Sequence, residues 1–174
     1  MEEFELTYLA KELPADLRDY PSKEVIDIYV PASTEHPVLR IRKFGSVHEI
    51  TKKQPIKGGD SSHQLETTIP LTPEEFSTLS QVKGKKVSKT RYYYQRANTV
   101  FEFDIFRDAL LGLVLVDVEF KSQEEKSVFV MPEFCLADVT QEKLTAGGML
   151  CGKSYGDIEK DLEKFGYQKI TADF

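Results

Sequence analysis

The sequence predicts an α+β fold in which eight antiparallel strands close into a barrel with a charged interior and peripheral helices. One observation is that residues 2–135 consist of short segments of strand length separated by turn residues. Eight strands can close a barrel whose interior admits side chains or one small ligand. The other is that Glu3 and Glu5 alternate with Phe4 and Leu6, a pattern that recurs in later segments. Because successive side chains on a strand point to opposite faces, each such segment has one apolar face and one ionic face.

The predicted strands follow one another along the first part of the chain. They cover residues 2–9, 23–30, 38–44, 47–53, 63–69, 85–94, 99–104 and 113–120. Gly45 and Ser46 separate the third and fourth strands by two residues, which is typical of a tight hairpin turn. Short consecutive strands of this kind favour antiparallel pairing throughout.

Helices are expected between and after the strands. Residues 11–20 form a short helix or turn that Pro14 interrupts. Thr72 is the expected N-cap of a second helix, because Glu75 completes a Thr-x-x-Glu capping box. Two further helices are expected within about residues 138–166.

The first of these C-terminal helices is expected to begin at Thr140 and to end at Gly147 and Gly148. The second is expected to begin near Tyr155 and to end at Gly166, since glycine is the commonest residue just after a helix. No repeat or linker interrupts the chain, so residues 1–174 are expected to form one domain.

Composition narrows the class of protein. The formal net charge of the 174 residues is −6, and non-specific nucleic-acid binding needs a basic surface, so no nucleic-acid partner is expected. No apolar run approaches the roughly 20 residues of a membrane helix. The first residues lack the basic and apolar regions of a signal peptide. We therefore expect a cytoplasmic protein without a membrane partner, either a monomer or a homodimer.

The ionic strand faces carry mostly one sign of charge each. Arg40 and Arg42 alternate on one strand, whereas Asp117 and Glu119 alternate on another. A pair of this kind in isolation is typical of a solvated strand face, and Glu102 is expected at the solvent or the rim. Several such faces turned inward would instead line a tunnel, with acids for a divalent cation and bases for a polyanion.

Seven short motifs occur in a fixed order along these strands. They are Glu3-Phe4-Glu5-Leu6-Thr7, Leu39-Arg40-Ile41-Arg42, Thr51-Lys52-Lys53, Glu66 before Ile69-Pro70-Leu71, Lys89-Thr90-Arg91-Tyr92, Asp104-Ile105-Phe106, and Gly112-Leu113 followed by Asp117-Val118-Glu119. Each motif alone is weak, but together and in this order they are specific. With them the chain resembles the CYTH superfamily of triphosphate tunnel metalloenzymes.

The resemblance implies an eight-stranded tunnel in which acids bind Mg²⁺ or Mn²⁺ and bases hold a triphosphate. The metal candidates that it implies are Glu3, Glu5, Glu66, Asp104, Asp117 and Glu119. The triphosphate-binding candidates are Arg40, Arg42, Lys53, Lys89 and Arg91. Tyr29 and Lys53 are the catalytic candidates.

The implied function is metal-dependent hydrolysis of a triphosphate compound, with inorganic triphosphate as the first choice of substrate. Thiamine triphosphate and nucleoside triphosphates are alternative substrates, and a class IV adenylyl cyclase would use the same tunnel. Thr7 stands where the family's opening motif has a lysine. A threonine hydroxyl cannot replace a lysine in activating water, which keeps open a tunnel that binds a polyphosphate or a phosphorylated metabolite without turnover.

Overall fold

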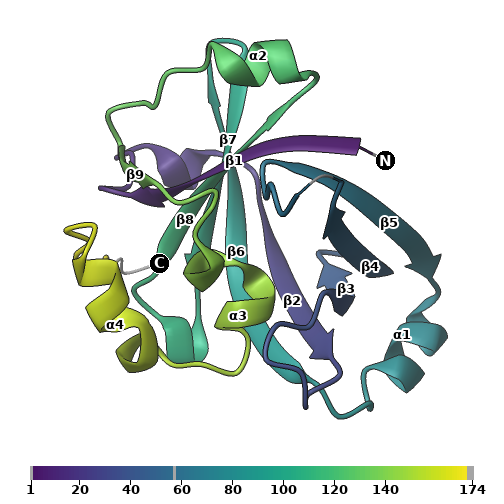
Figure 1. Cartoon of the computed structure of the whole chain (residues 1–174). Helices are drawn as coiled ribbons and strands as arrows, with labels where there is room; N and C mark the ends of the chain where they lie inside the picture. Colours follow the sequence, from purple (N-terminus) through teal and green to yellow (C-terminus); the bar gives the residue numbers. More distant parts are fainter. Residues whose placement is uncertain (1, 57, 172–174) are drawn as a thin grey trace.

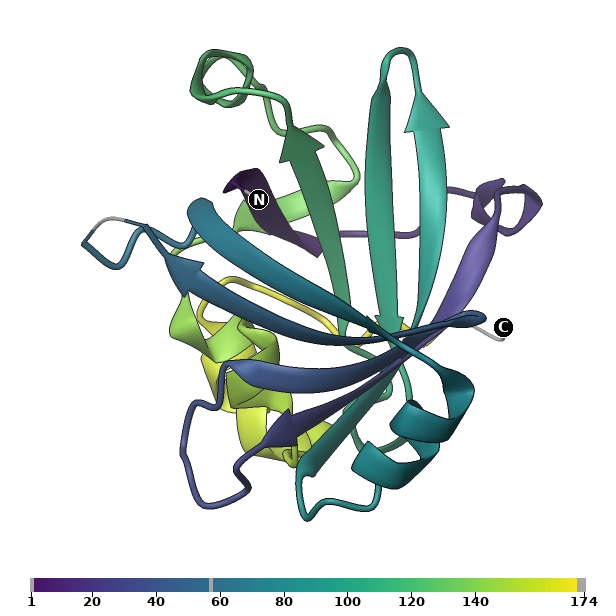
Figure 2. The ribbon, with the colours of Figure 1, turned by 90° about the vertical axis from the view of Figure 1, so that its right-hand side faces the viewer.

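The structure is a computed structural model that describes residues 2–56 and 58–171. Its strands form one antiparallel sheet in the order β5-β4-β3-β2-β6-β7-β8-β1-β9, and β1 also pairs with β5 (Figures 1 and 2). The strands are β1 (Glu2–Ala10), β2 (Ser22–Val30), β3 (Leu39–Phe44), β4 (Val47–Pro55), β5 (His63–Leu71), β6 (Lys85–Arg96), β7 (Thr99–Phe106), β8 (Val114–Phe120) and β9 (Cys135–Asp138). The pairing of β1 with β5 closes β1 to β8 into a barrel, which confirms the predicted closed eight-stranded fold.

Short helices surround the barrel. They are α1 (Pro73–Leu79), α2 (Gln123–Ser127), α3 (Gly147–Leu150) and α4 (Tyr155–Glu163), with the 3₁₀ turns η1 (Leu17–Asp19), η2 (Asp108–Leu110) and η3 (Lys143–Thr145). Thr72 caps α1 through the predicted capping box with Glu75. None of the described helices has the length and apolar character needed to cross a membrane.

The prediction for the segment after β8 was partly wrong. No helix runs from Thr140 to Gly147; the segment forms η3, and Gly147 begins α3 instead of ending a helix. Thr140 accounts for the error, because its hydroxyl and amide both donate to the Asp138 carboxylate, at 2.5 and 2.9 Å, in a local turn. Such side-chain to backbone bonds compete with helix formation. The short elements α2 and β9 were not predicted.

One edge of β1 is shared by two strands. Residues Glu2 to Phe4 pair with β5, whereas Tyr8 to Ala10 pair with β9. Between them the Glu5 amide donates to the Ser62 carbonyl at 3.2 Å, and the Thr7 amide donates to Thr140 Oγ1 at 3.0 Å. The short β1–β5 ladder and a few further hydrogen bonds therefore close this seam. The Val139 amide, which donates to the Thr7 carbonyl at 2.9 Å, holds the segment after β9 against it.

Much of the apolar core lies on the outer face of β7, β8 and β1. Phe103, Val116 and Val118 are fully buried there, because the segment around Phe134 covers this face. Phe101 and Phe134 meet edge to face, with 5.0 Å between ring centroids. Aromatic pairs favour this arrangement. The alternation of these strands thus places their apolar residues outside the barrel and their charged residues inside it.

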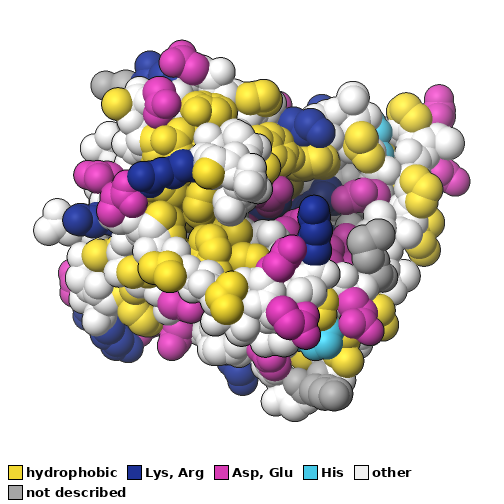
Figure 3. Space-filling view, turned by 90° about the horizontal axis from the view of Figure 1, so that it is seen from above, with side chains coloured by type: hydrophobic (Ala, Val, Ile, Leu, Met, Phe, Trp, Pro, Cys, Tyr) yellow, Lys and Arg dark blue, Asp and Glu magenta, His cyan; other side chains and the backbone are white. Residues whose placement is uncertain are grey.

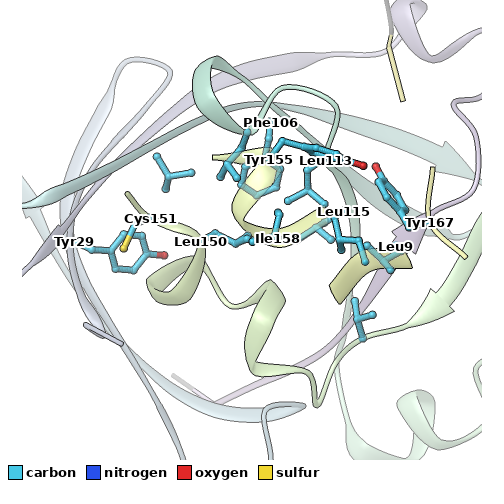
Figure 4. Close-up of a cluster of buried hydrophobic side chains, with 14 residues drawn as sticks. Leu9, Tyr29, Phe106, Leu113, Leu115, Leu150, Cys151, Tyr155, Ile158 and Tyr167 are labelled. Carbon is cyan, nitrogen blue, oxygen red and sulfur yellow. The ribbon is translucent and has the colours of Figure 1, made fainter. Parts of the chain in front are cut away.

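The inward-facing positions become apolar at one end of the barrel. Two residues beyond the acids Asp27, Asp104 and Asp117 along the inward face lie Tyr29, Phe106 and Leu115. With Leu9 and Val87 they pack against Leu150 of α3 and against Ile158 and Leu162 of α4 (Figure 4). The helices and these side chains form an apolar floor at this end of the tunnel.

Candidate active site

A cavity of about 380 Å³ occupies the inside of the barrel. It is lined by every residue predicted for the site: Glu3, Glu5, Tyr29, Arg40, Arg42, Lys53, Glu66, Lys89, Arg91, Asp104, Asp117 and Glu119. Seen from above, basic and acidic side chains gather around a hollow in the surface (Figure 3). The alternation rule therefore locates these side chains, whereas their individual roles stay predictions.

The strand register brings the charged side chains together across the sheet. Arg91 lies opposite Asp104, and Lys53 lies opposite Glu66. Residues directly opposite each other on antiparallel strands have their Cβ atoms about 5 Å apart and share a face. Acids and bases on neighbouring strands consequently contact each other. We call Arg40, Arg42, Lys53, Lys89 and Arg91 the basic set.

Lys53 connects three carboxylates from two other strands. Its Nζ lies 2.6 Å from Glu3, 3.5 Å from Glu5 and 3.7 Å from Glu66. Glu66 also accepts from Arg40 Nη2 at 3.4 Å. Burial alone would lower the pKa of Lys53, but the nearby Glu5 and Glu3 carboxylates raise that pKa well above its ordinary value. Lys53 therefore keeps its positive charge at any physiological pH.

Arg91 is the centre of a second ionic cluster. Its Nε and Nη2 donate to the two oxygens of Asp104 at 2.7 and 2.6 Å, and Nη2 also donates to Asp117 Oδ2 at 2.9 Å. Its Nη1 donates to Glu102, and Lys89 donates to Asp104. A planar guanidinium suits such two-pronged binding of carboxylates.

Two acids that pair with residues of the basic set were missed in the sequence analysis. Glu102 was expected at the solvent or the rim, but it lines the cavity and accepts a hydrogen bond from Arg91. Asp27 is 2% exposed and accepts from Arg42 Nε and Nη2 at 2.6 and 2.8 Å. Both alternate with apolar neighbours, so the same two-residue period could have identified them.

The pKa of Asp27 follows from its fixed partner. Burial alone would raise this pKa, but the Arg42 charge and its hydrogen bonds lower it further than burial raises it, to about 2. Asp27 is therefore ionised across the neutral range and keeps Arg42 in place. Tyr29 is a neighbour whose hydroxyl accepts from Arg40 Nη1 at 3.4 Å. Burial raises the pKa of Tyr29, so that its hydroxyl keeps its proton.

On β1, β7 and β8, four carboxylates that line the cavity crowd one another; we call Glu5, Glu102, Asp117 and Glu119 the acidic set. Glu5 lies opposite Glu119 in the register of β1 and β8, and Glu102 lies opposite Asp117. Burial and the Glu5 and Asp104 charges raise the pKa of Asp117 to about 7. Burial and the carboxylates of Glu102 and Glu5 likewise raise the pKa of Glu119. This side of the cavity has more negative charge than its bases neutralise.

The chemistry of the acidic set suits a hard divalent cation. Carboxylate oxygens are the preferred ligands of Mg²⁺, and a cation would relieve the repulsion that raises the pKa values of Asp117 and Glu119. Within the described residues, no three His, Cys, Asp or Glu side chains converge closely enough to form a metal site as they stand. The donor set therefore fits a metal in its chemistry, with its members still apart.

Thr7 lies beside the acidic set. Its hydroxyl donates to Asp117 Oδ1 at 2.8 Å, while Arg91 donates to Asp117 Oδ2. Both oxygens of Asp117 are thus oriented by a partner. The threonine that replaces the motif lysine has a defined contact in the tunnel.

Comparisons with known proteins agree with this geometry. No family model matches the chain. The inorganic triphosphatase of Nitrosomonas europaea is 32% identical over 146 residues, covering 82% of this chain and 92% of that protein. A solved inorganic triphosphatase structure aligns with a TM-score of 0.62 and 25% identity, over 86% of this chain and 93% of its own. A conserved hypothetical protein of Pyrococcus furiosus shares the fold, with a TM-score of 0.51 and 19% identity over 72% of this chain and 83% of its own.

The identity and the coverage of the curated relative, together with the ionic barrel, decide the family. The chain belongs to the inorganic triphosphatase family within the CYTH superfamily of triphosphate tunnel metalloenzymes.

Proposed function

We propose that the protein hydrolyses inorganic triphosphate inside the tunnel, assisted by Mg²⁺ or Mn²⁺. The observation that carries the proposal is that a basic set and an acidic set face one cavity of about 380 Å³. A triphosphate needs cationic partners for its oxygens, and a hard metal ion needs carboxylates. The triphosphatase relative, which matches most of the chain, supports the same reaction.

The basic set would bind the substrate by exchanging some of its carboxylate contacts for contacts with phosphate oxygens. Lys53 and Arg91 contact carboxylates that face the same cavity. Phosphate oxygens would replace part of these contacts, so the bases are already oriented and lose little side-chain freedom on binding. Positive charge held in place also stabilises the negative charge that develops on the transferred phosphoryl group.

The acidic set would hold the metal ion. Glu5, Asp117 and Glu119 were expected as ligands, and Glu102 joins them because it lies opposite Asp117. When bound, the cation would neutralise phosphate charge and polarise the phosphorus–oxygen bonds. The other expected ligands have basic partners: Asp104 holds Arg91 and Lys89, whereas Glu3 and Glu66 hold Lys53. We assign these three to positioning the bases.

Asp117 is the metal candidate whose two oxygens both have a defined partner. Thr7 and Arg91 orient these oxygens, and a bound cation would lower the pKa of about 7 by offsetting the charges of the neighbouring acids. The two expected catalytic residues receive other roles. Tyr29 keeps its proton and can donate a hydrogen bond, and Lys53 supplies charge.

Phosphate release tests the proposal. We expect turnover of inorganic triphosphate with Mg²⁺ or Mn²⁺, slower turnover of ATP and thiamine triphosphate, and loss of turnover when EDTA removes the metal. Glu119→Gln should abolish the metal dependence of triphosphate binding, because the neutral amide loses the charge that a hard cation prefers. Full triphosphate turnover in EDTA would contradict the metal role, and formation of cyclic AMP from ATP would indicate a cyclase instead.

A tunnel that binds polyphosphate without turnover is the second candidate, and Thr7 is the observation that favours it. Its hydroxyl contacts Asp117 but has no charge of its own. In that case calorimetry would detect triphosphate binding while phosphate release stayed at the background rate. Thr7→Lys should then raise turnover more than affinity, by up to about 10²-fold if a lysine restores acid–base help.

A further inference from the structure

The basic side chains around the cavity differ in their partners. Five of them have a carboxylate within ion-pairing distance: Arg40, Arg42, Lys53, Lys89 and Arg91. Lys143 of η3 also lines the cavity, and no described carboxylate forms an ion pair with it. Lys143 comes from the segment after β9 and not from the barrel. It is thus a positive charge at the cavity edge without an ion-pair partner among the described residues.

Lys143 lies where two segments of the chain touch at the edge of the tunnel. A Cβ on Gly148 would lie 2.2 Å from the Pro37 carbonyl and 2.6 Å from the His36 ring. A Cβ on Gly147 would lie 2.1 Å from the Tyr29 hydroxyl. The glycines therefore allow the C-terminal segment to approach the connection between β2 and β3 closely. Lys143, His36 and Pro37 all line the cavity here.

The backbone that carries Lys143 is held in place. Thr145 Oγ1 donates to the carbonyls of Val139 and Glu142 at 3.2 and 3.0 Å. Gln141 contacts the other side of the seam, because its Nε2 donates to Asp60 at 2.8 Å and its Oε1 accepts from the Ser61 amide at 3.2 Å. Hydrogen bonds on both sides of Lys143 fix the position from which its flexible side chain extends.

Polar side chains that can form hydrogen bonds line the cavity wall from Arg40 of the basic set to this edge. Arg40 contacts the Tyr29 hydroxyl, and that hydroxyl lies against Gly147, four residues from Lys143. His36 stays neutral near pH 7, because burial and the Lys143 charge both lower its pKa, so that it can serve as a hydrogen-bond partner. Glu142 lines the same edge, and its negative charge disfavours the binding of an anion there. Glu35 is a second acid near His36.

We infer that Lys143, together with His36, forms an outer anion subsite that binds the phosphate beyond the third of a linear polyphosphate. The inference rests on the proposed function, since the basic set is assigned to the first three phosphates. The next phosphate along the chain would extend past Arg40 and Tyr29 toward the cavity edge. There it would meet a cation that has no carboxylate to displace, so binding carries no cost of breaking an ion pair.

The experiment compares triphosphate with tetraphosphate as substrates of the metal-loaded protein. Lys143→Gln should raise the KM for tetraphosphate about tenfold, the scale of one charged hydrogen bond, while changing the KM for triphosphate less than about twofold. The value of kcat should stay the same for both, because Lys143 belongs to η3 and not to the strands that carry the acidic set. Glu142→Gln should change the tetraphosphate KM in the opposite direction, since it removes the opposing charge.

Lys153→Gln is the matched control, because it makes the same charge change outside the tunnel cavity. It should leave the KM for triphosphate and the KM for tetraphosphate unchanged. Lys143→Arg should restore most of the tetraphosphate affinity. Equal changes of KM for both substrates, or no change, would overturn the subsite. If the wild type turns over neither compound, the proposed function fails while the subsite is still tested. Calorimetry of the two compounds must then show the same selective loss of tetraphosphate affinity in Lys143→Gln.

Discussion

Asp104 and Asp117 lie on neighbouring strands of the tunnel and share one partner. Arg91 Nη2 donates to both carboxylates, at 2.6 and 2.9 Å, and both side chains are buried. Their pKa values nevertheless shift in opposite directions. Burial would raise the pKa of Asp104, but Arg91 and Lys89 together lower it well below its ordinary value. For Asp117, burial and the Glu5 and Asp104 charges outweigh Arg91 and raise the pKa to about 7.

The difference shows that the other charged groups around each aspartate, and not the shared Arg91, set the direction of its pKa shift. Asp104 has a second base, so it is permanently ionised and serves to hold the basic set. Asp117 has a second and a third acid nearby and a neutral donor in Thr7. Its neighbours therefore do not neutralise its negative charge, and Asp117 can bind a metal ion or a proton. Substitutions of these two aspartates and of their neighbours test whether the surrounding charges set their roles.

The largest expected effect is on stability in Asp104→Asn. Removing this charge leaves Arg91 and Lys89 buried with fewer partners, and breaking a buried pair in this way costs about 3–5 kcal/mol of unfolding free energy. Urea unfolding at pH 7.5 measures the change. Asp117→Asn is the matched control and should leave stability unchanged or raised at this pH. Equal losses in the two variants would mean that the two acids have the same role.

The second effect is a pH dependence that belongs to Asp117. Its raised pKa means that the native state holds a proton which the unfolded state releases near pH 4. Stability of the unliganded protein should therefore fall by about 2–4 kcal/mol as pH rises from 4 to 7, and then level off. Asp117→Asn should remove most of this slope. A wild type and a variant with parallel pH profiles would place the pKa of Asp117 in the ordinary range.

The third effect separates two adjacent lysines on β4. Lys53 faces the tunnel and contacts Glu3, whereas Lys52 is exposed on the outer face. Lys53→Ala should weaken triphosphate binding by about 1.5–3 kcal/mol, the scale of a hydrogen bond to a charged group. Lys52→Ala should leave it unchanged. Calorimetry with triphosphate and Mg²⁺ gives both values, and similar losses in both variants would show that binding depends on overall charge.

The smallest effect concerns Thr7. Thr7→Val keeps the shape of the side chain but removes the hydrogen bond to Asp117, which costs about 0.5–1.5 kcal/mol at pH 8. The cost should shrink below pH 6, where Asp117 is protonated, and the pKa of Asp117 should rise. The pH profile of unfolding, compared with that of Thr68→Val, whose hydroxyl donates to Glu66 Oε1 at 2.8 Å on β5, measures both effects. An unchanged midpoint would mean that the hydroxyl does not influence Asp117.

Much of the barrel could be read from the sequence because strand alternation is a local property. The period of two placed Glu5, Arg91 and Asp117 on inward faces without any knowledge of the neighbouring strands. The ends of the pattern were harder to interpret. The helix predicted from Thr140 was wrong because a side-chain turn with Asp138 competes with it, and Glu102 was placed at the rim because its partner Arg91 comes from another strand.

The strand patterns in the sequence were enough to predict the closed ionic barrel, the inward set of acids and bases, and the resemblance that identifies the family. Which acid meets which base depends on how the strands pair, since the register of β6 and β7 brings Arg91 to Asp104, and the register of β1 and β8 crowds Glu5 against Glu119. Electrostatic energy depends on distance and on burial, and both arise when distant strands pair. Two aspartates with the same alternating pattern in the sequence therefore acquire opposite pKa shifts in the folded protein.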